Sequence, residues 1–84
     1  MKLLQDVDRM VKNVKQSRNV IYQDQWMWMS FDSLLYAATY KIERARLTKD
    51  LDKKLDDLLD AINYLRFAAA RVLMEKKRDL SFVR

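Results

Sequence analysis

Apolar residues recur at intervals of three and four positions along three stretches of this chain, which is the spacing of helices with one apolar face. The stretches cover about residues 2–16, 30–47 and 48–78. The predicted buried faces are Leu3, Leu4, Val7, Met10, Val11 and Val14 in the first, Phe31, Leu34, Leu35, Ala38, Ile42 and Ala45 in the second, and Leu51, Leu55, Leu58, Ile62, Leu65, Ala69 and Val72 in the third. Residues 17–29 are treated as a connection.

The second and third predicted helices begin with residues that cap helices. Ser30 is a suitable N-cap, since its hydroxyl can accept a hydrogen bond from the first turn, and Asp32 follows it closely. Thr48 is the predicted cap of the third helix. Asp50 and Asp52 would then lie in a first turn where the helix dipole favours negative charge.

The composition indicates an all-α chain. Gly, Pro, Cys and His are absent, so tight hairpin turns lack their usual residues and helices lack their usual breakers. We predict one domain over residues 1–84, a small helical bundle of three main helices with the last one long. A third helix of about 45 Å would extend past its shorter neighbours. We therefore expect a homo-oligomer, a dimer or larger, in which third helices pack together at the small residues 68–70.

The missing residue types also restrict the chemistry. Without Cys or His the chain cannot form an ordinary zinc, iron–sulfur or copper site, or use histidine as an acid or base. A bound metal should be a hard cation such as Mg²⁺ or Mn²⁺. No apolar run approaches the roughly 20 residues of a membrane span, and the first residues include acids that a signal peptide would not carry. We expect a cytoplasmic protein with no membrane partner. Because the net charge of +5 is not concentrated in a dense basic block, nucleic acid is not an expected partner.

Acidic residues are concentrated at the start of the third predicted helix. Five of the twelve acids fall between positions 50 and 60. Asp57, Asp60 and Asn63 follow one another at intervals of three residues and therefore share a helix face. Neighbouring carboxylates repel, which favours a shared proton or a bridging cation. Asp57 and Asp60 are thus candidate metal ligands and Asn63 a candidate for orienting a ligand or a water. The alternative is a solvated face, which is the favoured interpretation for Asp50 and Asp52.

The second predicted helix carries a complementary set of charges. Glu43 could add a carboxylate to a metal site formed with Asp57 and Asp60. Lys41 and Arg44 could contact phosphate oxygens, Arg44 through a bidentate pair of hydrogen bonds. The alternative is ordinary salt bridging between adjacent antiparallel helices, from Lys41 or Arg44 to Asp57 or Asp60.

Aromatic residues offer a further possible contact with a ligand. Tyr22 and Trp26 could stack on a nucleobase, because an aromatic face stacks without hydrogen-bond readout. The alternative is that Trp fills the core of a small helical protein. The remaining tyrosines are expected to line helix interfaces with their hydroxyls at the edge, and they are Tyr36, Tyr40 and Tyr64.

The order of these residues resembles that of a known family. Tyr22-x-x-x-Trp26, Lys41-x-x-Arg44 and Asp57-x-x-Asp60-x-x-Asn63-Tyr64 are similar to the nucleotide modification associated domain family. That family occurs largely in phages and bacteria and is similar to the all-α NTP pyrophosphohydrolases of the MazG and dimeric dUTPase type. The resemblance covers about residues 12–73.

The resemblance implies a helical oligomer that acts on nucleotides. Enzymes of this fold hold Mg²⁺ with carboxylates from two helices and cleave an NTP between its α and β phosphates. Carried over, Asp57 and Asp60 match the acidic pair of the later helix, and Lys41 and Arg44 match the basic pair of the earlier one. The matching aromatic positions, Tyr22, Trp26 and Tyr64, would contact substrate. The chain departs from the pattern in two places: Glu43 stands alone where a Glu-x-x-Glu pair is expected, and Gln23 replaces a glycine.

Three functions follow as hypotheses. The leading one is a Mg²⁺-dependent nucleotide-binding protein of NTP pyrophosphohydrolase type, which hydrolyses or sequesters (deoxy)nucleotides. Lys41 and Arg44 would stabilise the transferring phosphoryl group. The second is a non-catalytic helical interaction protein, such as a small phage-type inhibitor or a nucleotide-sequestering module. The third, a basic nucleic-acid binder, requires binding that weakens steeply with salt.

Overall fold

The computed structural model describes residues 2–22 and 28–83, and the side chains of residues 2–13 and 28–78. It contains three α-helices, α1 (Lys2–Tyr22), α2 (Phe31–Leu47) and α3 (Leu51–Val83), and no strand within the described residues. The prediction of an all-α chain with a long last helix is confirmed. None of the described helices is long and apolar enough to cross a membrane.

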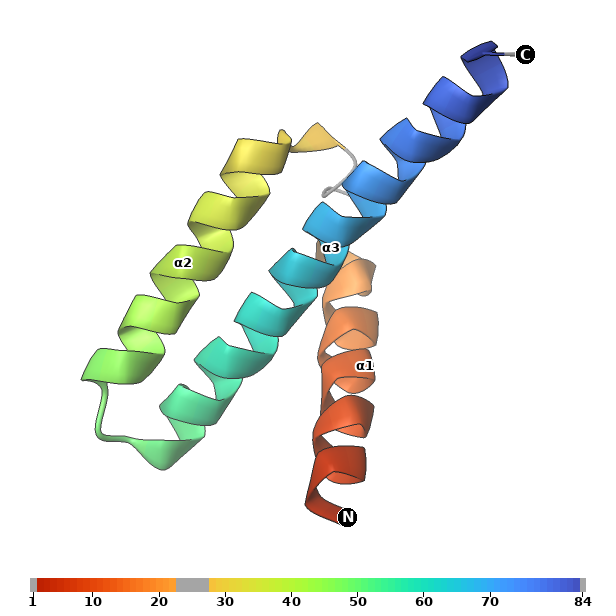
Figure 1. The fold of residues 1–84 in the computed structure, drawn as a ribbon. Coiled ribbons are helices and arrows are strands. Elements are labelled where there is room, and N and C mark those ends of the chain that lie inside the picture. Colours follow the sequence, from red (N-terminus) through yellow and green to blue (C-terminus); the bar gives the residue numbers. More distant parts are fainter. Residues whose placement is uncertain (1, 23–27, 84) are drawn as a thin grey trace.

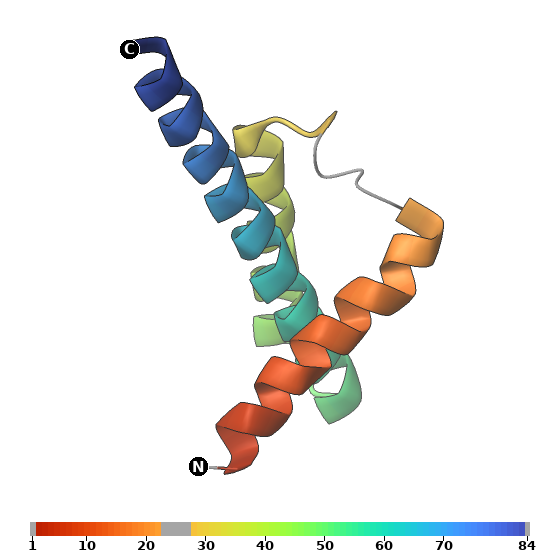
Figure 2. The same ribbon diagram turned by 90° about the vertical axis from the view of Figure 1, so that its right-hand side faces the viewer.

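The helices form an antiparallel pair with a third helix laid across it. α2 and α3 run side by side, joined by the connection 48–50, and most contacts between helices belong to this pair (Figure 1). α1 crosses α3 and contacts it over a smaller area (Figure 2). The C-terminal part of α3 extends beyond the start of α2 (Figure 1). The result is an elongated molecule of 51 × 27 × 26 Å.

Two predicted helix ends were wrong in the same direction. α1 continues to Tyr22 instead of ending near Gln16, and α3 continues to Val83 instead of ending near Arg78. Ser17 and Asn19, which suggested a break, have helix propensities only a few tenths of a kcal/mol worse than good helix formers. Without Gly or Pro the helix has no strong reason to stop there.

The caps of α2 and α3 are well defined. Ser30 is the N-cap of α2, as predicted, and its Oγ accepts a hydrogen bond from the Ser33 backbone N–H at 3.1 Å. Thr48, however, is the C-cap of α2 and not the cap of α3. Asp50 caps α3, because its Oδ1 accepts hydrogen bonds from the backbone N–H groups of Asp52 at 2.9 Å and Lys53 at 3.2 Å.

The buried core is small and only partly follows the predicted faces. Leu34, Ala38 and Ala45 of α2 are buried, as is Val11 of α1. The predicted stripe of α3, apart from the half-buried Ile62, is instead exposed in the single chain, and so are several predicted core residues of the other helices, including Leu3, Leu4, Met10, Phe31, Leu35 and Ile42. Among the side chains of α3 that the structure describes, the buried ones are Asp57, Leu59, Asp60, Ala61, Asn63 and Ala68.

Candidate functional site

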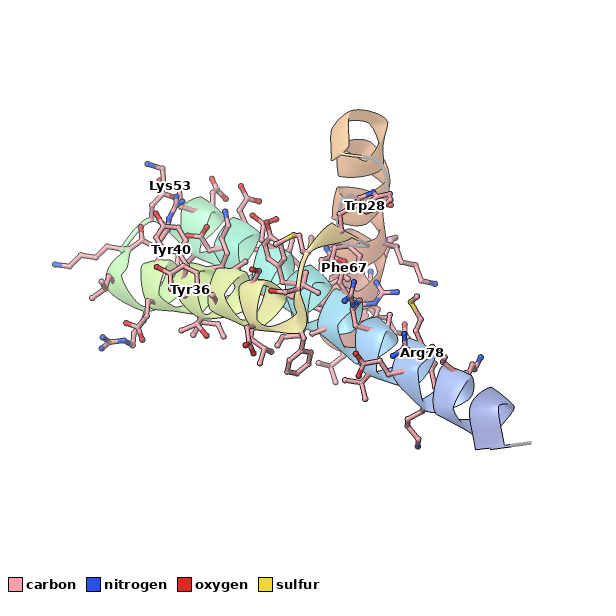
Figure 3. All side chains as sticks on the ribbon, turned by 90° about the horizontal axis from the view of Figure 1, so that it is seen from above. Trp28, Tyr36, Tyr40, Lys53, Phe67 and Arg78 are labelled. Atoms are coloured by element: carbon pink, nitrogen blue, oxygen red, sulfur yellow. The ribbon has the colours of Figure 1, made fainter. Side chains whose placement is uncertain are left out.

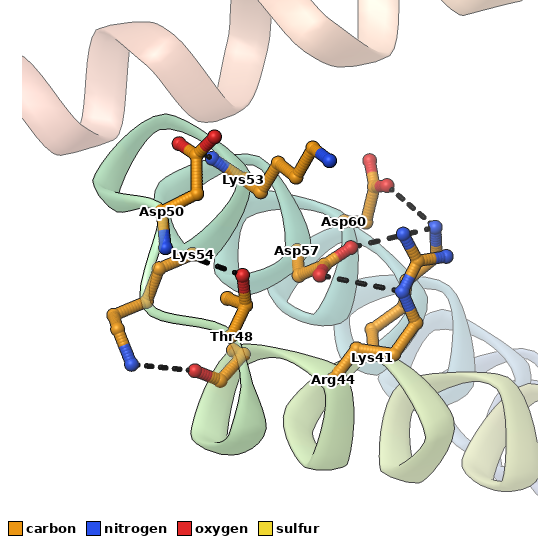
Figure 4. Close-up of polar contacts among 9 residues, drawn as sticks. Lys41, Arg44, Thr48, Asp50, Lys53, Lys54, Asp57 and Asp60 are labelled. Atoms are coloured by element: carbon orange, nitrogen blue, oxygen red, sulfur yellow. Dashed lines mark hydrogen bonds and ion pairs between the residues drawn. The ribbon is translucent and has the colours of Figure 1, made fainter.

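The acidic face of α3 meets the basic residues of α2 in one charged cluster (Figure 4). The Lys41 Nζ lies 3.1 Å from the Asp60 Oδ2 and 3.8 Å from the Asp57 Oδ1. The Arg44 Nε lies 3.5 Å from the Asp57 Oδ2. Two cations therefore balance two carboxylates, and the ammonium of Lys41 bridges both acids.

The cluster follows from the register of the antiparallel pair. Lys41 and Arg44 are three residues apart on α2, and Asp57 and Asp60 are three residues apart on α3. In antiparallel helices joined by the short connection 48–50, the earlier residue of one pair lies opposite the later residue of the other. Lys41 thus faces Asp60 and Arg44 faces Asp57, which is the salt-bridge alternative considered from the sequence.

The connection between the helices fixes this register. Thr48 donates its backbone N–H to the Arg44 carbonyl at 3.0 Å, and its Oγ1 accepts from the Asp50 N–H at 3.3 Å. The Lys54 Nζ donates to the Ala45 carbonyl at 2.7 Å, so α3 also satisfies an orphan carbonyl near the end of α2.

Burial differs strongly within the cluster. Asp57 and Asp60 are each 4% exposed, whereas the side chain of Arg44 is 49% exposed. The two carboxylates are therefore interior groups that need compensation. Arg44 sits at the edge, where its guanidinium can still reach a molecule from solvent.

Tyr40 is a neighbour of Arg44 that the sequence analysis had placed at a helix interface. The Arg44 Cζ lies 5.7 Å from the centroid of the Tyr40 ring, within the range of a cation–π contact. Tyr40 and Tyr36 project from α2 (Figure 3), and both are more than half exposed. The interface prediction for these two tyrosines is wrong, although the spacing of four residues between Tyr40 and Arg44 could have signalled the pair.

An open cavity of about 350 Å³ adjoins the exposed edge of the cluster. Its lining residues are Arg44, Leu47, Thr48, Lys53 and Asp57. Sequence reasoning did not include Thr48 or Lys53 in the site, because only the folded turn between α2 and α3 brings them beside Arg44. Two cations and a hydroxyl group thus meet at one opening, and one of the cations, Arg44, is paired with the Asp57 carboxylate of the same lining. Cations and hydroxyl groups are the side chains that bind phosphate oxygens.

Asn63 occupies a different face of α3 from the ion pairs. Its side chain is 6% exposed, and its Nδ2 donates to the carbonyls of Val11 and Leu59, both at 3.3 Å. The Oδ1 is buried and has no hydrogen-bond partner among the described residues. The amide thus connects α3 to α1 and contributes a buried acceptor one turn from Asp60.

Glu43 does not join the two aspartates. Its Oε2 pairs with Arg46, at 3.2 Å from the Nε and 3.0 Å from the Nη2, and its side chain is 52% exposed. Within the described residues, no group of three or more potential metal ligands of the Asp, Glu, His and Cys types lies close together. The pair Asp57 and Asp60 has Lys41 as its cation in this arrangement.

Of the three aromatic candidates, Tyr64 is the one whose side chain lies among the described residues. Tyr64 is partly buried one turn after Asp60, and its ring meets that of Phe67 edge to face with centroids 6.5 Å apart. Trp26 and the side chain of Tyr22 lie outside the described residues. Only Tyr64 can therefore be placed relative to the cluster.

Comparison of the chain with protein-family models, curated proteins and solved structures gave no match. The family resemblance therefore rests on the residues quoted from the sequence alone.

Proposed function

We propose that this chain is a nucleotide-binding protein of the NTP pyrophosphohydrolase type, acting on a (deoxy)nucleoside phosphate. The observation that supports it is the position of Arg44, which is held by buried Asp57 on one side and borders an open cavity with Lys53 and Thr48 on the other. A guanidinium fixed in this way is pre-organised for a phosphate group, since little side-chain freedom is lost on binding.

The residues of the site would have different roles toward a bound phosphate group. Arg44 and Lys53 would contact phosphate oxygens, and the Thr48 hydroxyl would donate a further hydrogen bond. Asp57 and Asp60 would hold the cations in place. Lys41, with a side chain only 23% exposed and bridged between both acids, would act mainly by keeping the site assembled.

Mg²⁺ or Mn²⁺ has a restricted place in this proposal. Two carboxylates are as many as Mg²⁺ usually takes from a protein, but the Lys41 ammonium already lies between Asp57 and Asp60. The arrangement does not fit a metal ion unless Lys41 moves away. Metal binding at Asp57 and Asp60 is therefore a prediction that requires displacement of Lys41.

The test is a panel of nucleoside triphosphates, with and without Mg²⁺ or Mn²⁺, that measures thermal stabilisation and pyrophosphate release together. Arg44→Ala should abolish the stabilisation. Arg46→Ala is the matched control, because it removes the same side chain from the same helix but breaks only the exposed pair with Glu43. Stabilisation without release would define a binding module, and equal responses of the two variants would contradict the proposed site.

A second candidate function is a non-catalytic helical interaction protein. It is favoured by the many large apolar side chains that a single chain leaves exposed, among them Leu58, Leu65 and Val72 of α3. In either candidate function we propose that the chain works as a homo-oligomer. Charge reversal at Asp57 would not test this candidate cleanly, because Asp57 faces α2 of its own chain. Absence of any nucleotide response, together with a defined oligomer, would favour it.

A further inference from the structure

The predicted apolar stripe of α3 has the spacing of a coiled-coil seam. Its members are separated alternately by four and three residues, and they are Leu51, Leu55, Leu58, Ile62, Leu65, Ala69 and Val72. A strict repeat of this kind keeps one line of side chains turned toward a partner helix over its whole length. We call these seven residues the α3 seam.

The α3 seam lies on a face of α3 that neither α1 nor α2 covers. At 100° per residue, Asp57, which pairs with Arg44 of α2, and Asn63, which donates to Val11 of α1, point to two other sides of the helix. The seam residues Leu55, Leu58, Leu65 and Val72 are 38–45% exposed, and Leu51 is 77% exposed. In the view from above, α1 projects to one side of the α2 and α3 pair, and the described part of the chain places no helix on the opposite side (Figure 3).

The apolar surface continues from α3 onto α2. Leu35 and Ile42 are seven residues apart on α2, on the flank opposite to Lys41 and Arg44, and they are 36% and 43% exposed. Because Lys41 contacts the Asp60 side of α3, this flank of α2 lies toward the seam side. The exposed face is therefore two helices wide.

The amount of exposed surface matches what a dimer would cover. The accessible surface is 7095 Å², whereas a compact monomer of 10.1 kDa exposes about 5,300 Å². The radius of gyration of 14.8 Å also exceeds the roughly 12 Å of a compact domain of this length. The surplus of about 1,800 Å² lies within the roughly 1,000–2,500 Å² that each partner buries in an obligate homodimer.

We propose that a second copy of this chain covers the α3 seam and the adjoining flank of α2, with the two α3 helices antiparallel. Residues 50–60 carry five acids and two lysines, whereas residues 66–78 carry five basic residues and one acid. An antiparallel pair sets the acidic half of each α3 against the basic half of the other, and a parallel pair sets like against like.

Side-chain size gives the same orientation. Seam residues come in pairs three positions apart, such as Ala69 and Val72. In an antiparallel seam the first member of such a pair faces the second member of a pair on the partner helix, so Ala69 meets a leucine there. In a parallel pair Ala69 would face its own copy and leave a gap in the middle of an otherwise large apolar seam. The dimer does not depend on nucleotide binding, and each inference can fail without the other.

The first experiment is the molar mass in solution, by sedimentation equilibrium or light scattering at micromolar concentration. The native chain should have twice the mass of 10.1 kDa, and the double variant Leu58→Glu with Leu65→Glu should be monomeric with an unchanged helical circular dichroism signal per residue. Leu4→Glu is the matched control, since Leu4 is 67% exposed on α1, away from the seam, and this variant should stay dimeric. A monomeric native chain, or a double variant that stays dimeric, would overturn the proposal.

The second experiment tests orientation through disulfides in a chain that has no cysteine of its own. Leu55→Cys and Val72→Cys lie toward opposite ends of the seam, and Leu55 stands before and Val72 after a three-residue step, so the two positions can face each other in an antiparallel pair. When the two variant proteins are combined and oxidised, they should form a disulfide that joins one chain of each variant. Efficient disulfide formation by Leu55→Cys alone would show parallel helices and overturn the antiparallel arrangement.

Discussion

Replacing Lys41 with methionine tests whether the charged cluster stabilises the fold. The methionine keeps most of the length of the side chain and removes only its charge and hydrogen bonds. Asp60, which is 4% exposed, would lose the ammonium that now lies 3.1 Å away. Asp57 would keep Arg44 but would face Asp60 without the bridging cation.

The expected loss of stability is about 3 kcal/mol. At an effective dielectric constant near 20, a pair of charges 3.1 Å apart attracts by about 5 kcal/mol before desolvation is counted. Removing one partner from a buried pair usually costs about 3–5 kcal/mol, because the other charge stays buried without compensation. The lower end applies here because Lys41 is 23% exposed and water can partly replace it. In a domain of this size such a loss lowers the Tm by at least about 12 °C.

The measurement is urea unfolding followed by circular dichroism at one fixed chain concentration, since the stability of an oligomer depends on concentration. Arg46→Met is the control, and its exposed pair with Glu43 should cost at most about 1 kcal/mol. The double variant Lys41→Met with Asp60→Asn should recover at least about 1.5 kcal/mol of the single-variant loss, because the buried carboxylate that lost its ammonium is replaced by a neutral amide. Equal losses for Lys41→Met and Arg46→Met, or a double variant no better than Lys41→Met, would refute the reasoning.

Two further substitutions test the caps and the buried amide. Asp50→Ala should lower the free energy of unfolding in urea by about 1 kcal/mol, since two first-turn N–H groups lose their acceptor. Thr48→Ala should cost clearly less, and the reverse order would contradict the assignment of Asp50 as the cap. Asn63→Leu should change the free energy of unfolding by no more than about 1 kcal/mol, because it removes the long hydrogen bond to Val11 together with a buried acceptor that has no partner among the described residues. If the amide orients a ligand, the same variant should show weaker nucleotide-dependent thermal stabilisation.

The helices themselves could be predicted closely from local sequence. Three apolar repeats, the hydroxyl of Ser30 and the lack of Gly and Pro placed all three elements and both ends of α2. The errors at the ends of α1 and α3 arose because Ser17 and Arg78 resemble termini only weakly. A helix that can continue at a cost of tenths of a kcal/mol usually does when nothing stronger stops it.

Which face of α3 is buried could not be predicted in the same way. Periodicity located the seam and the polar ridge, but it does not say which helix covers each of them. Asp57 and Asp60 can be interior only because Lys41 and Arg44 lie opposite them, and that depends on the register of the turn 48–50. From the sequence alone, the observed pairing of Lys41 and Arg44 with the two aspartates is only the alternative to a metal site.

The position of Lys41 bears both on the stability of the fold and on whether a metal ion can bind at Asp57 and Asp60. An ammonium bridging two carboxylates supplies one positive charge where a divalent cation would supply two, so a metal ion can bind there only by displacing it. Lys41→Met removes this competitor and leaves two like charges close together. If Asp57 and Asp60 can act as metal ligands, the variant should therefore regain stability with Mg²⁺ while the native chain responds much less. A variant that stays equally unstable with Mg²⁺ and with a chelator would show that the two aspartates serve the packing of α2 against α3 and not a metal site.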